Sequence, residues 1–331
     1  MSENLSEPNI ERLLSALNHE KGDRVPNWDV LLDDRTLRHI LKKPMGKERI
    51  TTWSVSPEDA VIAAQATSQD SIVCSLSWHL PEGSILTEKD LDKAVLPDPS
   101  IAREKLKSYL AAVKGTKIGV CARLSAPMSS AYMSLGPIPI QSFMYLLYDD
   151  PVLVKRLIDL YLKYGLQLIE AIKDLPYHFY YIGDDVGSTA GPLISPDSMK
   201  EFWEPKTKEL IRAAQATERP IMFHCCGMQT PILPFMAEWG VNAMHPLQPV
   251  ANDIYAVKAK YGNKLTLVGN IDVAGLLSFG TPEDVRQSVK EHIERLADGS
   301  YVVCSSHSII DSVPPENYLA MVEATKEFGK Y

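Results

Sequence analysis

A histidine and two cysteines end the apolar run in "IMFHCCGMQT", residues 221–230. Alternate side chains of a strand share a face, so His224 and Cys226 are expected to point one way and Cys225 the other. If His224 faces a cavity, an imidazole nitrogen and a thiolate sulfur converge there, and this donor pair suits Zn²⁺. A buried histidine and cysteine without a metal fit the same spacing, so the pattern alone leaves both interpretations open.

A catalytic zinc site needs a third protein ligand and one open position. The late segment "VVCSSHSI" offers Cys304 and His307. These two residues have opposite parity, so at most one of them points inward if the strand stays regular. The sequence thus offers a complete ligand set in which Cys304 and His307 are alternatives.

Eight short runs rich in apolar and β-branched residues could position these ligands. Helical patterns follow all or nearly all of them, and the helix starts are marked by Ser-Pro or Thr-Pro followed by acids, which combine a cap oxygen with a preset proline dihedral. The predicted strands are residues 24–30, 71–76, 117–123, 177–184, 220–225, 241–245, 265–270 and 301–306.

Alternation of strands and helices implies parallel strands joined by right-handed crossovers. Eight such units in about 300 residues favour a TIM barrel. An open doubly wound sheet would carry a glycine-rich first turn, and no G-x-G-x-x-G follows any predicted strand. We therefore predict one α/β domain over residues 1–331, a (β/α)₈ TIM barrel with an N-terminal helical extension.

Catalytic residues of TIM barrels lie at the carboxyl ends of the strands. The predicted strand ends carry His, Cys, Asp, Asn and Trp, whereas other loops are rich in Lys and Glu. Besides the metal ligands, the candidates for catalysis or substrate binding are Asp29, Trp78, Arg123, Tyr181, Asp184, Asp185, Asn270, Asp272 and His307.

The candidates suit different tasks, and each has a structural alternative. One of Asp184 and Asp185 could donate a proton or hold a substrate cation, or the two could cap a loop. Arg123 suits a carboxylate. Trp78 and Tyr181 could wall an aromatic pocket or pack in the core. The motif "GNID", with Asn270 and Asp272, could position a substrate, hydrogen-bond a zinc ligand or form a turn.

The bulk composition excludes several classes of protein. A net charge of −8 and a pI near 5.5, without any basic stripe, argue against a nucleic-acid partner. No apolar stretch approaches the roughly 18 residues of a membrane span, and the polar start lacks the apolar core of a signal peptide. Five scattered cysteines make a poor disulfide framework. A cytoplasmic location is therefore expected.

Several long segments carry a resemblance to a known family. "FHCCGMQTPILPFMAEWGVNAMHPLQP", "KLTLVGNIDVAGLLSFGTPEDV" and "YVVCSSHSIIDSVPPENYLAMVEA" resemble the uroporphyrinogen decarboxylase superfamily, as do "ERLLSALNHEKGDRVP" and "DDVGSTAGPLISPDSMKEFWEPKTKELI". The resemblance covers nearly the whole chain in order. It implies a (β/α)₈ barrel and one of two activities, the decarboxylation itself or methyl transfer to or from a corrinoid protein.

The segment after the first predicted strand separates these branches. The decarboxylases resemble M-R-Q-A-G-R there, with arginines that hold the substrate's carboxylates, whereas this chain has "VPNWDVLLDDRTLRHIL". Asp29, Asp33 and Asp34 would repel a polyanion, and Arg35 and Arg38 lack the setting of the motif. Porphyrin decarboxylation is therefore disfavoured, and the methyltransferase branch is expected.

Methyltransferases of this superfamily resemble H-x-C on the fifth strand plus a cysteine after the eighth, all binding zinc. His224 and Cys226 match the first two positions. Counted back from "PPEN", the third position falls on His307 and not on Cys304, which departs from the pattern. The resemblance thus implies Zn²⁺ on His224, Cys226 and one of these two, and we favour His307.

The expected function is transfer of a methyl group between a small methyl donor, such as a methoxylated aromatic compound, and the cobalt of corrinoid (cobalamin) on a separate protein. An imidazole in place of a thiolate leaves zinc more electrophilic, which favours an ether oxygen and hence O-demethylation. No D-x-H-x-x-G pattern occurs, so the corrinoid is expected on a partner.

Three alternatives remain open at this point. The first is a methylcorrinoid:thiol methyltransferase of the coenzyme M type. The second is a metal-free decarboxylase-type lyase in which His307 and Asp184 or Asp185 handle protons, and the third is a non-catalytic relative. The apolar segment 129–147 is interpreted as a homodimer face or a substrate lid.

Overall fold

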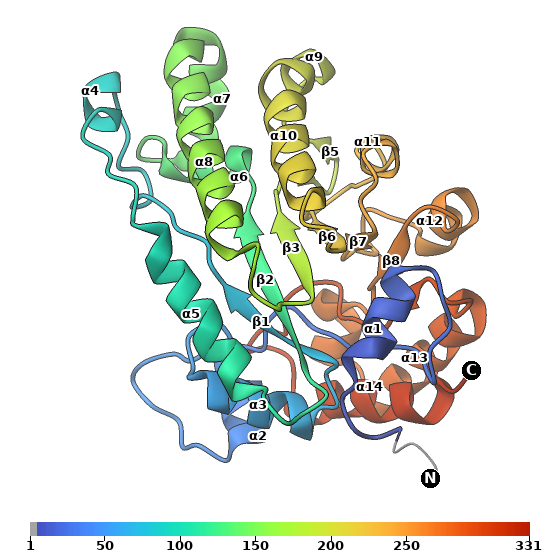
Figure 1. The fold of residues 1–331 in the computed structure, drawn as a ribbon. Coiled ribbons are helices and arrows are strands. Elements are labelled where there is room, and N and C mark those ends of the chain that lie inside the picture. The colour runs from blue at the N-terminus through green and yellow to red at the C-terminus, as the bar shows by residue number, and fades with distance from the viewer. Residues whose placement is uncertain (1–4) are drawn as a thin grey trace.

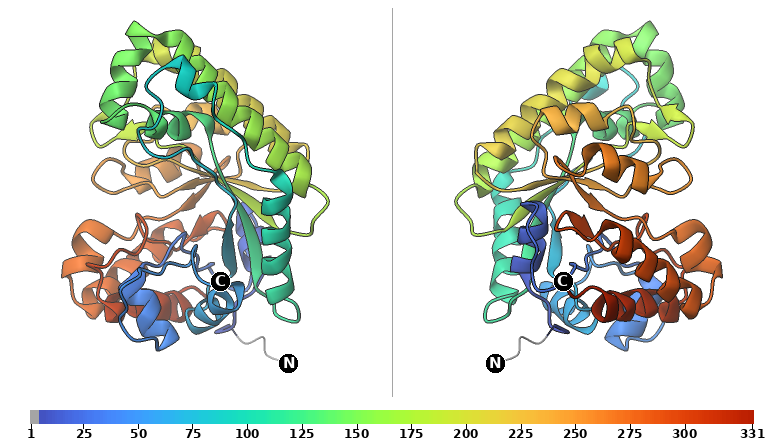
Figure 2. Two further views of the ribbon diagram at one scale, coloured as in Figure 1. Left: turned by 90° about the vertical axis from the view of Figure 1, so that its left-hand side faces the viewer. Right: turned by 90° about the vertical axis from the view of Figure 1, so that its right-hand side faces the viewer.

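Seven parallel strands form one curled sheet in the computed structural model, which describes residues 5–331. The strand order is β1-β2-β3-β6-β7-β8-β9, so strands that follow one another in this series are neighbours in space. Helices cover the outside of the sheet (Figures 1 and 2). The strands are β1 Ser71–Ser75, β2 Gly119–Ser125, β3 Phe179–Gly183, β6 Ile221–His224, β7 Ala243–His245, β8 Thr266–Val268 and β9 Tyr301–Val302.

The helices start where the sequence predicts them. Ser56, Ser195 and Thr281 each accept a backbone amide three residues on, with proline in the first turn. A short hairpin, β4 Gly187–Ser188 and β5 Gly191–Pro192, follows β3. The helices are α1 Ile10–Leu17, α2 Asp34–Leu41, α3 Pro57–Ala66, α4 Glu88–Leu91, α5 Pro99–Ala112, α6 Pro127–Ser134, α7 Pro139–Asp149, α8 Pro151–Ile172, α9 Pro196–Ser198, η1 Met199–Trp203, α10 Glu204–Gln215, α11 Leu233–Glu238, α12 Ile254–Tyr261, η2 Val273–Leu277, α13 Pro282–Leu296 and α14 Pro315–Phe328.

The eighth position of the barrel is filled by residues 24–30, but not as a regular strand. Asn27 forms an isolated parallel bridge with Val303, and its carbonyl accepts the amide of Asp70, which directly precedes β1. Pro26 has no amide to donate, which interrupts a ladder at this point. The prediction of a strand here is therefore wrong in detail, although the segment does close the barrel between β9 and β1.

Helix α1 seals the amino-terminal end of the barrel. Leu13 and Leu17 are fully buried in a cluster with side chains from the strands. The amide of Ile10 donates to the carbonyl of Lys117, 2.9 Å away, and the Thr266 hydroxyl donates to the carbonyl of Ala16. The predicted N-terminal helical extension is thus the floor of the barrel. Among residues 5–331, no helix combines the length and apolar character needed to span a bilayer.

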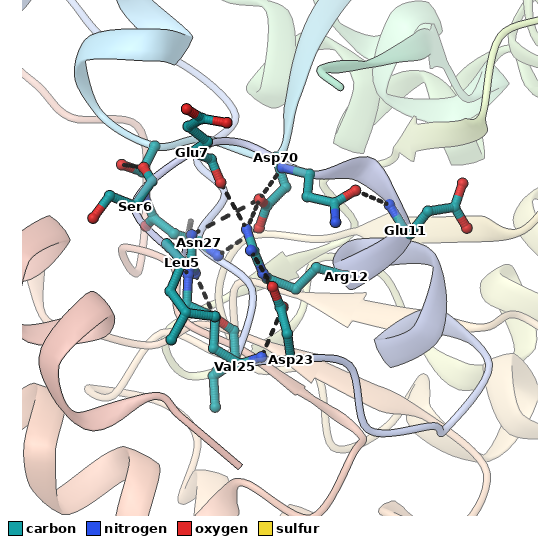
Figure 3. A network of polar contacts seen from close by, with 12 residues as sticks. Leu5, Ser6, Glu7, Glu11, Arg12, Asp23, Val25, Asn27 and Asp70 are labelled. Carbon is teal, nitrogen blue, oxygen red and sulfur yellow. Dashed lines mark hydrogen bonds and ion pairs between the residues drawn. The ribbon is translucent and has the colours of Figure 1, made fainter. Parts of the chain in front are cut away.

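A buried ion network ties this floor to the barrel seam (Figure 3). Arg12 of α1 donates to Asp70 Oδ1 at 2.6 Å and, through Nε and Nη2, to both oxygens of Asp23 at 2.6 and 2.7 Å. Asp70 also accepts the amides of Asn9 and Asn27. Burial raises the pKa of Asp70 although Arg24 and Arg12 oppose this, so the charged carboxylate depends on these partners.

We predict that Asp70→Ala destabilises the fold strongly. Removing one member of a buried ion network leaves the others uncompensated, which costs about 3–5 kcal/mol. The midpoint of urea unfolding, followed by circular dichroism, would measure the loss. Glu104→Ala is the matched control, because Glu104 pairs only with the exposed Lys107 on the same helix and such pairs contribute little. Equal midpoints for the two variants would contradict a closing role for Asp70.

Candidate active site at the barrel mouth

A cavity of about 320 Å³ opens at the carboxyl ends of the strands. In Figure 1 this is the end toward which β2 and β3 point, where α6 and α7 lie. Six residues singled out from the sequence line the cavity, namely Arg123, Tyr181, Asp185, His224, Cys226 and His307. The concave, partly polar mouth is thus the candidate site.

His224 is the last residue of β6, level with Gly183 of β3 and His245 of β7. Its Nδ1 lies 2.7 Å from Nδ1 of His245. His245 is completely buried, and burial together with the neighbouring His224 holds its pKa well below the usual value. Because this contact occupies one ring nitrogen of His224, the other, Nε2, is left facing Cys226 Sγ at 3.5 Å.

Asp185, which follows β3, completes a cluster with these two residues. Its Oδ1 lies 3.2 Å from His224 Nε2 and accepts the Cys226 amide at 2.9 Å. Burial alone would raise the pKa of Asp185, but the His224 ring and the hydrogen bonds with His224 and Cys226 lower it below its usual range. One ligand atom from each residue lies within 4.8 Å of the other two.

The donor set fits a zinc ion. Tetrahedral zinc with Zn–N of about 2.05 Å, Zn–S of about 2.3 Å and Zn–O of about 2.05 Å places nitrogen roughly 3.6 Å from sulfur and roughly 3.3 Å from oxygen. The corresponding separations from His224 Nε2 are 3.5 Å to Cys226 Sγ and 3.2 Å to Asp185 Oδ1. Nitrogen, thiolate and carboxylate donors together are a zinc ligand set.

The two alternative third ligands, Cys304 and His307, lie in different surroundings. His307 lines the cavity, and burial and the nearby His224 lower its pKa. Cys304 is fully buried among apolar side chains inside the barrel, where its thiol donates to Asp29 Oδ1 at 3.4 Å. His307 therefore lies in the cavity with His224, whereas Cys304 lies in the barrel interior below the cavity.

Two predicted acids, Asp29 and Asp184, are buried outside the lining of the cavity. Asp29 Oδ1 accepts the amide and hydroxyl of Ser305, and burial raises its pKa to about 6. Asp184 accepts the amide of Ser129 in α6 and the indole N–H of Trp203, and burial raises its pKa to about 6 as well. Their contacts fix the loops that follow the strands.

Three further candidates point away from the mouth. Trp78 packs against two tyrosines of α8. Asn270 donates to the carbonyl of Leu247 at 2.6 Å, and Asp272 accepts the first amides of η2. Asn270 and Asp272 instead line a separate pocket of about 240 Å³ with His292.

Several lining residues were not singled out individually from the sequence. Val30, Trp53 and Ser125 carry no motif, whereas Ser129, Tyr132 and Met133 belong to segment 129–147, which is interpreted from the sequence as a homodimer face or a substrate lid. For the place of Asp185 beside His224 and Cys226 a signal did exist. The fourth and fifth predicted strands are neighbours in any such barrel, so the residues after the fourth lie beside His224 and Cys226.

The fold and the mouth cavity define a TIM-barrel protein with an enzyme-like site. Residues 79–328 match the family model described as uroporphyrinogen decarboxylase (URO-D). The chain therefore belongs to this family. A solved structure, "methyltransferase from Methanosarcina mazei", has the same fold, with a TM-score of 0.75, 21% identity, and coverage of 97% of this chain and 99% of that one.

Curated relatives include both methyltransferases and uroporphyrinogen decarboxylases. The chain is 23% identical to "Methylcobamide:CoM methyltransferase MtaA" of Methanosarcina barkeri, over 96% of its own length and 97% of that protein's. It is 28% identical to "Methylated-thiol--coenzyme M methyltransferase" of Methanosarcina mazei, over 45% of this chain and only 38% of the relative. The fold prediction and the prediction of the methyltransferase branch are confirmed.

We predict that one of the five cysteines reacts under native conditions. Cys226 is partly exposed in the cavity, whereas Cys74, Cys121, Cys225 and Cys304 are buried. Labelling with iodoacetamide followed by peptide mass spectrometry should modify Cys226 first, slowly because burial raises its pKa. Cys226→Ser should abolish this label and Cys225→Ser should leave it. Faster labelling of any other cysteine would contradict the described cavity.

Proposed function

We propose that the protein is a zinc-dependent methyltransferase that moves a methyl group between a small molecule and the cobalt of corrinoid on a separate protein. The observation that carries this proposal is the convergence of His224 Nε2, Cys226 Sγ and Asp185 Oδ1 in a cavity at the barrel mouth. The similarity to a methylcobamide:CoM methyltransferase over nearly the full length of the chain supports corrinoid as the partner in this reaction.

We propose His224 and Cys226 as two zinc ligands and Asp185 or His307 as the third. Cys304 is the weaker candidate, because its thiol is buried against Asp29. Zinc bound there would supply a Lewis acid for an oxygen or stabilise a thiolate.

The residues around the cluster orient it. His245 holds the His224 ring through Nδ1, so that Nε2 points into the cavity. The Cys226 amide holds the Asp185 carboxylate. If His307 is the third ligand, the Asp185 carboxylate in the cavity lining would be free to accept or return a proton of the reactant. Asp184 acts through the position of α6 and not through contact with substrate.

Two directions of transfer are supported by different observations. A ligand set with a single thiolate favours a methoxylated aromatic donor, since nitrogen and oxygen ligands leave zinc more electrophilic. The names of the relatives favour a thiol of the coenzyme M type as acceptor. The metal-free lyase has less support, because Arg123 is the one arginine among the described residues that line the cavity, whereas a polycarboxylate needs several.

The partners belong to the same proposal. The corrinoid protein would approach the mouth, since methyl transfer requires near contact of the reacting atoms. Within segment 129–147, Met133 of α6 lines the cavity, while Ile140 and Tyr145 are exposed on α7. A homodimer through this apolar surface and a cytoplasmic location remain proposals.

We predict about one zinc per chain in protein loaded with zinc and then desalted. His224→Ala and Cys226→Ser should each lose it, because two ligands seldom hold zinc tightly. Asp185→Asn and His307→Ala identify the third ligand, and Cys304→Ser is the matched control expected to keep the metal. Inductively coupled plasma mass spectrometry provides the readout. Zinc retained in both His224→Ala and Cys226→Ser would refute the site.

We also predict that zinc-loaded protein changes the corrinoid spectrum. With a reduced corrinoid protein and a methoxylated aromatic donor, cobalt methylation should appear in the visible spectrum. With a methylated corrinoid protein and coenzyme M, demethylation should appear instead. Cys226→Ser should lower either rate at least about a hundredfold if zinc activates the reactant. No spectral change in either direction would contradict methyl transfer with these reactants.

A further inference from the structure

Arg123 has neutral partners at the edge of the cavity. Its Nη1 donates to the hydroxyls of Ser75 at 3.0 Å and Ser77 at 2.7 Å, and its guanidinium lies 4.1 Å from the centre of the Trp53 ring. Its Nε is buried and has no hydrogen-bond partner. Among the described residues, no carboxylate lies within ion-pair distance of Arg123, although most other arginines have one.

A guanidinium in this position is costly without an anion. Arginine stays protonated in proteins, and a charge removed from water needs a charged partner or full hydrogen bonding. Arg123 is half-buried in the wall of the cavity, and burial lowers its pKa. The nearby acid, Asp185, is already engaged by His224 and the Cys226 amide. None of the described carboxylates is therefore free to pair with Arg123, which leaves its guanidinium available to an anion in the cavity.

The strand register places the backbone of Arg123 below the proposed metal site. Arg123 of β2 is level with Tyr181 of β3, whereas Ser125 is level with Gly183, the partner of His224. Its backbone is thus two residues deeper along the strands, about 6.5 Å at the usual rise, but its guanidinium reaches up to the Ser77 hydroxyl, which also accepts the Ser125 hydroxyl at the level of His224. A small molecule can therefore place one end on Arg123 and the other end beside His224 and Cys226.

The other groups around Arg123 do not replace the anion. Desolvation and the positive charge of Arg123 lower the pKa of His79, which favours the neutral form of this histidine. The Tyr181 hydroxyl faces His245, and burial raises its pKa well above its usual value. The indole of Trp53 covers one face of the guanidinium and leaves its edge for hydrogen bonds.

We propose that the cavity binds a small organic monoanion, a carboxylate or a sulfonate, with its charged group on Arg123 and its reactive end beside His224 and Cys226. As a statement about the methyl donor or acceptor this rests on the proposed function, whereas the anion subsite itself stands without it. Arginine suits both groups because its planar donors pair with two oxygens at once.

Binding of matched pairs of probes to zinc-free protein tests the subsite by titration calorimetry. The probes are benzoate against benzamide, and benzenesulfonate against benzenesulfonamide. At least one anion should bind about tenfold or more tightly than its neutral partner, as expected for a charge-assisted hydrogen bond in a partly buried site. The two pairs separate a carboxylate site from a sulfonate site. Zinc is left out because the metal would itself attract an anion.

Variants assign the preference to Arg123. Arg123→Met should remove this preference, because it should weaken binding of the anion roughly ten- to hundredfold and leave binding of the neutral probe unchanged. Arg123→Lys keeps the charge and should retain part of the preference for the anion. This variant still tests the subsite if Arg123→Met does not fold. Arg103→Met is the matched control, because Arg103 pairs with Asp174 on the outer helices.

Equal binding within both pairs, absence of binding by all four probes, or an unchanged anion affinity in both Arg123 variants would overturn the subsite. Its failure is distinguishable from that of the proposed function. An anion preference without zinc binding or methyl transfer would leave the subsite and refute the methyltransferase. Zinc binding and methyl transfer without an anion preference would refute the subsite alone.

Discussion

The buried carboxylate of Asp70 joins three segments of the chain, namely the floor helix α1, the irregular seam and the start of β1. It pairs with Arg12 of the floor helix, accepts the amide of Asn27 in the seam, and directly precedes β1. Residues 24–30 lack a continuous ladder of backbone hydrogen bonds. Hydrogen bonds from side chains therefore hold part of this segment in place. The separations across the mouth depend on this closure, because its lining combines β2, β3 and β6 with loops on both sides of the seam, including Val30 and His307.

The barrel interior has an apolar layer above α1 and polar layers nearer the mouth. Apolar side chains, including Cys121 and Met222, fill the lower part above α1. Arg123 and Tyr181 form the next level, and His224 lies at the rim with Asp185. An apolar base excludes water beneath the polar levels, so charges there interact through a poorly screening medium. One rigid set of strands therefore fixes the depth of the arginine and the depth of the proposed metal site.

Much of this could be predicted from the sequence, and the misses have physical causes. Alternating apolar runs and proline-marked caps locate seven strands and the helices, since both signals are local. Pro26 breaks the first strand, which an apolar pattern does not reveal. Directions of side chains beyond a strand end depend on loop geometry, so parity could not separate Cys304 from His307 or show that Asn270 and Asp272 face a different pocket. The place of Asp185 beside His224 and Cys226 was not predicted, because partners were sought on distant strands.

The closed floor has a consequence for the order of events. With α1 packed into the amino-terminal end of the barrel, the cavity with the proposed metal site opens at the opposite end, at the mouth. Under the proposed function the same opening serves both the small reactant and the docking corrinoid protein. The small molecule must then enter before the larger partner covers the opening, and the product can leave only after that partner departs. The kinetic mechanism would have a compulsory order of binding, because the corrinoid protein is a reactant and also closes the opening while it is bound.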